Sequence, residues 1–329
     1  MLIVGNIVEK YTAIVSANSW FKKSLPLNTS AFKKSFKPKK IQPVAGAENK
    51  QRLDIAINNC EWLGETNDGK VIFLYQYTGR SPILREIGRL REISFRAVGE
   101  GTNKRRDIDQ HDKFYYHLIL WDKDDKEIVG AYRFGDAKQL TQSYRNRLYS
   151  ASLFHYHAAM QPYLEQGLEL GRSFVQPKYW GKRSLDYLWY GIGAFLKRHP
   201  QYRYLFGPVS LSNDLPALAK DLIVCFYQTY FSKTETLASA LIPYKSHSDT
   251  NDLFSGENYQ EDFSILKKRL NAMGAKVPTL YKQYTETYEE GGVHFLSFSI
   301  DPDFNNCIDG LVLADLSKLK EKKSLRYMR

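Results

Sequence analysis

The stretch Leu168-Glu-Leu-Gly-Arg-Ser-Phe-Val-Gln-Pro177 decides our prediction of the fold. It has the pattern of a buried strand, and it carries a carboxylate, Glu169, and an arginine, Arg172, three residues apart. Burying a carboxylate costs free energy unless the group is paired or its proton is used. A basic turn that contains Gly181 follows, and then a helix. A strand, a glycine turn and a helix start in this order direct backbone N–H groups at a phosphate.

The surrounding segments extend this strand into a mixed α/β sheet. We predict strands over residues 70–77, 115–121, 128–134, 168–176, 204–210, 293–300 and 308–313, and helices over 81–96, 184–198 and 216–231. Residues 99–112 and 243–262 are polar and are predicted to be loops. The strands 168–176 and 204–210, joined by the helix 184–198, form a parallel crossover unit. Ligands of such units bind at the carboxyl ends of the strands. The predicted fold is a mixed sheet with a central parallel pair, flanked by helices.

The positive charge of the chain is concentrated at its two ends. The net charge of the 329 residues is +11, of which residues 1–50 contribute +7 and residues 317–329 contribute +5, so the remainder is close to neutral. We predict a basic amphipathic N-terminal segment and linker over 1–50, one globular domain over 51–316, and a basic tail over 317–329. Two interpretations of the ends stay open. They are solvated, flexible tails, or they dock to anionic lipid headgroups or to an acidic carrier protein.

Sequence signals for export are weak. Glu9 and Lys10 interrupt the apolar start where a signal peptide should be continuous, and no apolar run approaches the roughly 20 residues that span a bilayer. The cysteines Cys60, Cys225 and Cys307 have no metal-binding or redox spacing. We therefore expect a cytoplasmic protein, with peripheral association at the inner face of the membrane as an option, no bound metal and no nucleic-acid partner.

Two alternatives to the main interpretation stay open. His117 and Asp122 have the H-x4-D spacing of glycerolipid O-acyltransferases, although a separation of five places them on opposite faces of a strand. A non-catalytic membrane-binding protein would need only the basic ends. Other motifs are weaker, because His155 and His157 lack a third metal ligand nearby and Ser210 lacks the G-x-S-x-G turn of a serine nucleophile.

Several motifs together identify a family. They are Leu84-Arg-Glu-Ile-Gly-Arg-Leu-Arg-Glu-Ile-Ser-Phe-Arg96, Gly130-Ala-Tyr-Arg133, Glu169-Leu-Gly-Arg172, Trp189-Tyr-Gly-Ile192, Leu205-Phe-Gly-Pro-Val-Ser210, Pro278-Thr-Leu-Tyr-Lys-Gln-Tyr284, Ser299-Ile-Asp-Pro-Asp-Phe304 and Asp309-Gly-Leu-Val-Leu313. With these motifs, residues 80–316 resemble the GNAT-type lipid N-acyltransferases. That group contains the ornithine-lipid and related amino-acid N-acyltransferases, and it is distantly similar to acyl-homoserine lactone synthases.

The resemblance implies a GNAT fold and an N-acyltransferase. The donor would be an acyl carrier protein (or acyl-CoA) as co-substrate, with no permanently bound cofactor. The acceptor would be the α-amine of an amino acid such as ornithine, and the product an N-acyl amino acid or lyso-aminolipid. Among matching residues, Arg96, Asp109, Asp112 and Arg133 are expected to bind substrate.

The expected catalytic residues are Glu169, Arg172 and Tyr227. Glu169 would take the proton of the amine, Arg172 would hold the acceptor carboxylate, and Tyr227 would protonate the departing thiolate. Backbone N–H groups near residues 170–174 would stabilise the oxyanion. A buried structural ion pair remains the competing interpretation of Glu169 and Arg172.

The expected donor site follows the same strand. It comprises Phe174, Val175, Lys178, Gly181, Lys182, Arg183 and Ser184. The usual GNAT pyrophosphate loop ends on a small residue, and here Arg183 stands in that place. This departure favours a carrier protein over free coenzyme A, because the phosphopantetheine arm of a carrier protein has no adenosine pyrophosphate.

Overall fold

The computed structural model describes residues 41–142, 148–250 and 252–328. The amphipathic N-terminal segment predicted within residues 1–40 lies outside this range. None of the helices in the described ranges combines the length and the apolar character that crossing a membrane requires.

The centre of the fold is a sheet whose strands lie in the order β1-β2-β3-β4-β6-β7-β10-β9. Its strands are β1 (Glu61–Glu65), β2 (Val71–Gln76), β3 (Tyr116–Asp122), β4 (Glu127–Asp136), β6 (Gly167–Val175), β7 (Tyr204–Leu211), β9 (Val293–Asp301) and β10 (Cys307–Asp315). Within this sheet β6 and β7 pair in parallel, and the other neighbours are antiparallel. The predicted mixed sheet with a central parallel pair is confirmed.

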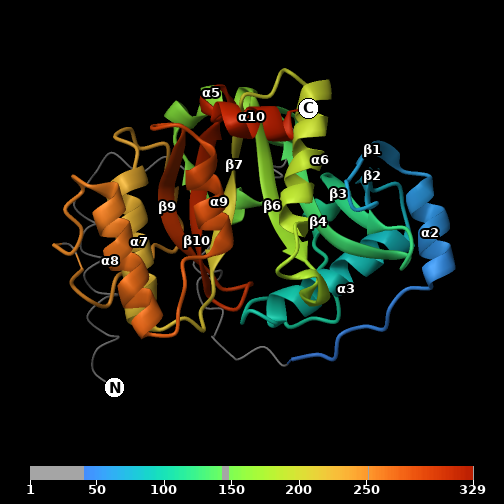
Figure 1. Ribbon diagram of the computed structural model, residues 1–329, viewed down its shortest axis with the longest axis horizontal. Helices are drawn as coiled ribbons and strands as arrows, with labels where there is room; N and C mark the ends of the chain where they lie inside the picture. The colour runs from blue at the N-terminus through green and yellow to red at the C-terminus, as the bar shows by residue number, and fades with distance from the viewer. Residues whose placement is uncertain (1–40, 143–147, 251, 329) are drawn as a thin grey trace, which may run out of the picture. The chain divides into compact units, whose positions relative to one another are not determined.

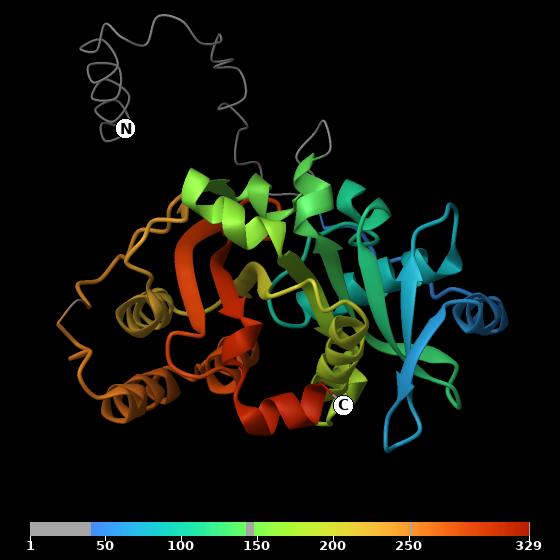
Figure 2. The same ribbon diagram turned by 90° about the horizontal axis from the view of Figure 1, so that it is seen from above.

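Helices cover both faces of the sheet. They are α2 (Lys50–Asn58), α3 (Pro82–Arg96), α4 (Ala137–Gln142), α5 (Gln161–Glu165), α6 (Ser184–Arg198), α7 (Ala217–Phe231), α8 (Tyr259–Ala272), α9 (Thr279–Thr287) and α10 (Glu321–Tyr327). Figures 1 and 2 show α6, α9 and α10 together on one side of the sheet and the green segment that contains α4 and α5 on the other. A second, short sheet pairs β5 (Phe154–Tyr156) with β8 (Ala238–Ala240).

The alternation of side chains along β2 shows how the two faces form. Ile72 and Leu74 pack in the cluster that contains α6, whereas Phe73 and Tyr75 pack in the cluster that contains α2 and α3. Successive side chains of a strand point to opposite faces, so a continuous apolar run such as this one is covered on both sides.

Some elements differ from the prediction. The predicted loop 243–262 runs into α8, which begins at Tyr259 after the capping residue Asn258, and α9 was not predicted. In the predicted basic tail 317–329, residues 321–327 form α10. Tyr327 of this helix is buried, and its hydroxyl donates to Asp186 of α6 at 3.0 Å.

The parallel pair at the centre is short. β6 and β7 pair only from Gly167↔Tyr204 to Glu169↔Phe206. Beyond this point β6 stays with β4 as far as Val175, and β7 stays with β10 as far as Leu211, so the two strands separate. Gly207 lies directly after the last pair with φ of 155°, and a Cβ there would stand 1.9 Å from the carbonyl oxygen of Leu170.

Candidate active site

The separation of β6 and β7 opens a cavity of about 450 Å³. Residues 171–175 of β6 and 208–210 of β7 line its walls, and Trp180 lies at its edge with an exposed side chain. The indole N–H of Trp180 donates to the carbonyl oxygen of Val175 at 2.8 Å. This volume lies within the range of roughly 300–1,000 Å³ that is typical of small-molecule sites.

A β-bulge in β6 borders the cavity. Ala131 pairs with Phe174 and Arg133 pairs with Gly171, so Arg172 and Ser173 together oppose the single residue Tyr132. Arg172 has φ of 48°, which is uncommon for a residue with a side chain. A bulge leaves one residue out of the regular ladder of hydrogen bonds. The strand therefore loses its alternation at this point, which allows consecutive residues to reach the cavity.

The side chain of Arg172 lies between two aromatic rings and next to two carboxylates. Its guanidinium carbon lies 4.7 Å from the ring centre of Tyr149 and 4.5 Å from that of Phe304. Its Nε lies 3.3 Å from Asp107 and its Nη2 lies 3.9 Å from Asp109. Stacking and paired charges of this kind fix an arginine in a cavity wall.

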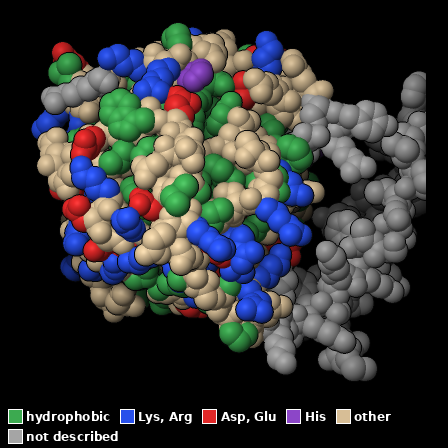
Figure 3. All heavy atoms as spheres, turned by 90° about the vertical axis from the view of Figure 1, so that its right-hand side faces the viewer, with side chains coloured by type: hydrophobic (Ala, Val, Ile, Leu, Met, Phe, Trp, Pro, Cys, Tyr) green, Lys and Arg blue, Asp and Glu red, His purple; other side chains and the backbone are tan. Residues whose placement is uncertain are grey.

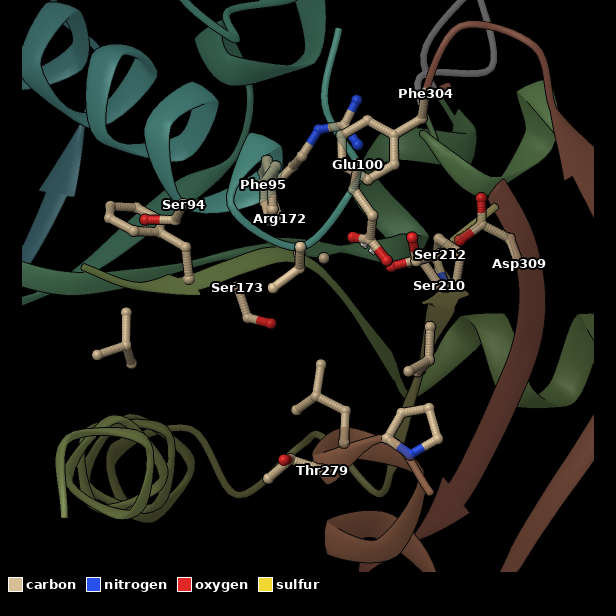
Figure 4. Close-up of a pocket in the computed structure, with 18 of the residues that line it drawn as sticks. Ser94, Phe95, Glu100, Arg172, Ser173, Ser210, Ser212, Thr279, Phe304 and Asp309 are labelled. Atoms are coloured by element: carbon tan, nitrogen blue, oxygen red, sulfur yellow. Dashed lines mark hydrogen bonds between the residues drawn. The ribbon is translucent and has the colours of Figure 1, made fainter. Parts of the chain in front are cut away.

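Two carboxyl groups face the cavity from other elements. Glu100 belongs to the loop after α3 and accepts a hydrogen bond from Ser210 Oγ at 3.0 Å, and Asp309 belongs to β10. Figure 4 shows Glu100, Ser210 and Asp309 close together, with Arg172 above them and Thr279 on the opposite side of the cavity. The site thus combines a bulged strand, one arginine and two carboxyl groups from distant parts of the chain.

Known proteins are similar to this chain in sequence. Residues 90–190 match the family model described as "Acetyltransferase (GNAT) domain". The chain is 29% identical over 306 residues to the glycine N(alpha)-acyltransferase of Bacteroides thetaiotaomicron, a match that covers 88% of this chain and 89% of the relative. It is 30% identical over 234 residues to the L-ornithine N(alpha)-acyltransferase of Agrobacterium fabrum. This match covers 69% of this chain and 73% of the relative.

This chain belongs to the GNAT family of N-acyltransferases. The predicted GNAT fold and the predicted N-acyltransferase activity are thereby confirmed. Among solved structures, the loading GNATL domain of CurA from Lyngbya majuscula matches with a TM-score of 0.37 and 13% identity, over 75% of this chain and 98% of that domain.

The predicted base of this N-acyltransferase, Glu169, does not line the cavity. Its side chain is 1% exposed and accepts hydrogen bonds from the backbone N–H groups of Tyr149 and Ser150, at 3.1 Å and 2.7 Å, and from the hydroxyls of Tyr115 and Ser150. Glu169 therefore anchors the segment that places the Tyr149 ring against Arg172.

Tyr227, predicted to protonate the thiolate, also lies away from the cavity lining. It is fully buried on α7, with its ring 4.9 Å from that of Tyr281 and 4.8 Å from that of Phe295. Of the three predicted catalytic residues, the structure brings only Arg172 into the cavity wall.

Three of the predicted substrate-binding residues lie outside the cavity lining, in contact with one another, and one of them lies next to Arg172. Asp112 is fully buried between Arg91, at 2.7 Å, and Arg133, at 3.0 Å. Arg133 also pairs with Asp109 at 2.8 Å, and Asp109 lies next to Arg172. The cavity lining does not include Arg91, Asp109, Asp112 or Arg133. These four residues form a charged layer that positions Arg172.

Arg96 has a similar supporting role. It pairs with Glu92 at 2.7 Å and donates to the backbone carbonyls of Gln42 and Lys104 at 2.9 Å and 2.7 Å. The bond to Lys104 connects the end of α3 to the loop that carries Glu100 and Asp107, and the bond to Gln42 connects it to the segment before α2.

The predicted donor residues divide into two groups. Phe174 and Val175 line the cavity. The others lie in the turn before α6 and at the start of this helix. Lys178 pairs with Glu127, Lys182 Nζ lies 5.1 Å from the Tyr179 ring centre, and Arg183 lies 3.4 Å from Asp186. Gly181 has φ of 76°, and Ser184 is the first residue of α6. This turn adjoins the cavity edge through Trp180.

The structure does not bring His117 and Asp122 together as a catalytic pair. His117 is fully buried, with Nε2 2.9 Å from the carbonyl oxygen of Asp112 and Nδ1 3.4 Å from Arg91. An arginine only donates, so Nδ1 accepts and Nε2 carries the proton. Burial lowers the pKa of His117 to about 4. Asp122, at the other end of β3, accepts from the backbone of the turn at residues 124 and 125.

Two residues of the cavity were missed by the sequence analysis. Asp309 stands within an apolar strand, the same signal that pointed to Glu169, and Glu100 stands between two glycines directly after an amphipathic helix. Within the described ranges, no group of three or more His, Cys, Asp or Glu side chains is arranged to hold a metal ion, and His155 and His157 have no third partner of this kind.

Proposed function

We propose that this N-acyltransferase moves a fatty acyl group from the thioester of an acyl carrier protein to the α-amine of an amino acid. The product would be an N-acyl amino acid or lyso-aminolipid. The cavity between β6 and β7 carries the proposal, because it combines an edge open to solvent at Trp180 with a polar end at Glu100, Arg172 and Asp309. The thioester enters along the separated strands, and the amino acid occupies the polar end.

The residues of the bulge supply the groups that would polarise the carbonyl of the thioester. Arg172 and Ser173 are the bulged residues, and their backbone N–H groups are our candidates for stabilising the oxyanion of the tetrahedral intermediate. Removing one such donor costs roughly 2.7–4 kcal/mol of transition-state stabilisation in enzymes where this has been measured. Arg172 is also the proposed partner of the acceptor carboxylate.

Glycine is the acceptor that we propose first. The relative named for glycine matches over 88% of this chain, whereas the relative named for ornithine matches over 69%. Ornithine is the second candidate, because its additional ammonium group suits a cavity end with two carboxyl groups, Glu100 and Asp309.

A carrier protein is the proposed donor because of the turn before α6. Arg183 occupies the place of a small residue, and it pairs with Asp186 in the first turn of the helix, which also pairs with Arg326. These paired side chains already occupy the helix start, where a pyrophosphate would bind.

A basic face supports the same donor. Figure 3 looks onto the side of the molecule that carries α2 and shows Lys and Arg side chains gathered there. A hollow of about 430 Å³ in this region is lined by Arg52, Arg80, Arg85 and Arg106 against a single carboxylate, Glu48. Positive patches accelerate association with acidic partners, and carrier proteins are the acidic partner that we propose.

The two donors can be distinguished with one variant. Arg80→Glu should raise KM for palmitoyl-carrier protein at least fivefold, and it should leave KM for palmitoyl-CoA unchanged. Equal KM changes for both donors would contradict docking of a carrier protein on this face. For wild-type protein, we expect a kcat/KM at least tenfold higher with the carrier-protein donor.

The basic segment 1–50 is proposed to bind anionic lipid. Full-length protein should sediment with phosphatidylglycerol vesicles and should remain in solution with phosphatidylcholine vesicles. Deleting residues 1–40 should remove this difference without loss of N-acylation in solution. Equal sedimentation with both vesicles would refute the lipid partner.

The activity itself is tested by mass spectrometry. Purified protein is incubated with palmitoyl-carrier protein and with glycine, ornithine, serine or lysine in parallel, and N-palmitoyl products are quantified. We expect the largest kcat/KM with glycine. A dominant ornithine product would select the second acceptor, and the absence of any N-acyl amino acid would overturn the proposed function.

A further inference from the structure

Glu100 is the cavity carboxylate whose position is best fixed by its own loop. The Glu100 N–H donates to the carbonyl of Phe95 at 2.9 Å, and the Gly99 N–H donates to Arg96 at 3.1 Å. Asn305 Nδ2 donates to the carbonyl of Gly99 at 2.8 Å. Gly99 and Gly101 have φ of 74° and 106°, which glycine adopts without a steric penalty. The loop is thus a tight turn that directs the Glu100 side chain to Ser210.

We propose that Glu100 is the general base that removes a proton from the acceptor's ammonium group, with the carboxyl group of Asp309 lining the same cavity. This inference rests on the proposed function. Both side chains line the cavity that would hold the amino acid, and they come from opposite ends of the sequence. Neither residue was among the catalytic residues that the sequence predicted.

The surroundings raise the pKa of both carboxyl groups. Burial raises the pKa of Glu100 to about 7, while the Ser210 hydrogen bond and the charge of Arg172 act in the opposite direction. Burial also raises the pKa of Asp309, well above its ordinary value, and the charges of Asp301 and Glu100 raise it further. With a pKa of about 7, Glu100 is partly ionised at neutral pH, so it can accept a proton and release it again.

The pKa of Glu100 suits an amine. The α-amine of a free amino acid is protonated at neutral pH, and a carboxylate whose pKa is raised to about 7 accepts its proton more readily than a carboxylate of ordinary pKa. An ordinary exposed carboxylate would be a far poorer acceptor, since general bases act best when their pKa lies near the working pH.

Glu169 is the natural competitor for this role, and its contacts argue against it. Its two oxygens already accept hydrogen bonds from two backbone N–H groups and two hydroxyls. It lies outside the cavity lining, where an incoming amine would have to displace Tyr149 or Ser150 to reach it. Glu169 is better described as a positioning residue that acts through Tyr149.

The reaction balances in three steps. The ammonium group gives one proton to the Glu100 carboxylate, and the free amine attacks the thioester carbonyl carbon to form the C–N bond. When the carbonyl double bond reforms, the C–S bond breaks and its electron pair stays on sulfur. The nitrogen then loses its second proton, which ends on the thiolate, and Glu100 releases the first proton to solvent. The products are the amide, the free thiol and one proton.

The first experiment is substitution with a matched control. Glu100→Gln keeps the size of the side chain and an acceptor for Ser210, and it should lower kcat at least 100-fold with glycine and palmitoyl-carrier protein. Glu257→Gln, an exposed position, should have wild-type kcat. A circular dichroism melt distinguishes loss of chemistry from loss of fold. A Glu100→Gln variant that folds and keeps kcat within threefold of wild type would overturn the inference.

The pH profile separates Glu100 from Glu169. Wild-type kcat should rise with pH, and the midpoint of this rise (the ionisation limb of the profile) should lie near pH 7, because Glu100 must be ionised to act. Glu100→Asp should keep an ionisation limb at a shifted position, whereas Glu100→Gln should lose it. Glu169→Gln should lower kcat but retain the limb. Loss of the limb in Glu169→Gln, with retention in Glu100→Gln, would assign the base to Glu169 instead.

Four other side chains act on Glu100 or are acted on by it. They are Arg172 of β6, Tyr281 of α9, and Cys307 and Asp309 of β10. Burial raises the pKa of the Tyr281 hydroxyl and of the Cys307 thiol, so both stay neutral near pH 7. Arg172, Tyr281 and Cys307 therefore give no limb near pH 7, and a limb that Glu100→Gln removes is assigned to Glu100.

A measurement without substrate tests the inference separately from the proposed function. Protein labelled with ¹³C at glutamate carboxyl carbons should show one resonance that titrates near pH 7 and that is absent in Glu100→Gln. A Glu100 resonance that titrates near pH 4 would overturn the inference even if wild-type protein makes N-acyl amino acids. If wild-type protein makes none, the proposed function fails, and this titration still decides whether Glu100 is poised as a base.

Discussion

The guanidinium group of Arg172 stacks on the ring of Tyr149, with 4.7 Å between the guanidinium carbon and the ring centre. The Tyr149 hydroxyl donates to Asp301 at 2.9 Å, and its backbone N–H donates to Glu169. One aromatic side chain thus connects Arg172 of the bulged strand to Asp301 at the end of β9.

Two substitutions of Tyr149 should separate stacking from hydrogen bonding. Tyr149→Phe keeps the ring on Arg172 and loses one hydrogen bond, so the free energy of unfolding should fall by about 1 kcal/mol. Tyr149→Ala also removes the ring and should cost at least about 3 kcal/mol. Urea denaturation measures both values. Equal losses for the two variants would show that the ring contributes nothing to holding Arg172.

Gly207 should be essential for the separation of β6 and β7. A Cβ at this position would stand 1.9 Å from the carbonyl oxygen of Leu170, and φ of 155° is unfavourable for other residues, so Gly207→Ala should cost several kcal/mol. A Cβ at Gly171, on the facing strand, would meet nothing within 4 Å, so Gly171→Ala is the matched control and should cost less than about 1 kcal/mol. Thermal and urea denaturation of both variants test this contrast. Similar stabilities would contradict the close strand contact.

Asp112 should be one of the most sensitive charged positions. Asp112→Asn would leave the buried charges of Arg91 and Arg133 undercompensated, and we expect a loss of about 3–5 kcal/mol in the free energy of unfolding. Lys123→Gln breaks an ion pair with Glu65 that is half exposed, and it should change the stability little. A small effect of Asp112→Asn would mean that the buried arginines find other partners.

The contribution of His117 to the free energy of unfolding should fall as the pH is lowered from 7 to 5, whereas Glu100, whose pKa burial raises to about 7, contributes in the opposite direction. Burial lowers the pKa of His117 from 6.5 to about 4, so between these values the unfolded chain binds a proton that the folded protein does not. The loss over this range should be roughly 2 kcal/mol. His117→Gln should reduce this difference by a similar amount in urea denaturation at the two pH values. An unchanged pH dependence in the variant would assign the effect to other groups.

Much of the fold could be predicted because its local signals agree. The helix from Pro82 begins after Ser81, whose hydroxyl accepts from the Ile83 N–H at 3.1 Å, and its apolar spacing is regular. The helix α8 escaped prediction because only Asp262, Phe263, Leu266 and Leu270 of its 14 residues are buried. Its capping residue, Asn258, was the signal available in the sequence.

The site could be predicted only in part. Arg172 and its strand were found from the buried charge pattern and the family resemblance. Burial alone cannot separate Glu169, whose oxygens are fully hydrogen-bonded, from Asp309, which faces a cavity. The bulge at Arg172 also breaks the strand alternation on which the prediction of side-chain direction depended.

The loop between α3 and β3 supplies Glu100, Asp107, Asp109 and Asp112. Parts of a protein open locally with free energies well below that of global unfolding, and they open in contiguous units. If this loop opens as one unit, the cavity loses Glu100 at the same moment as Arg172 loses Asp107 and Asp109. The molecules would then divide into a competent and an incompetent population. Arg96, which ties the loop to α3, would set the fraction of competent molecules and leave the turnover rate of each competent molecule unchanged.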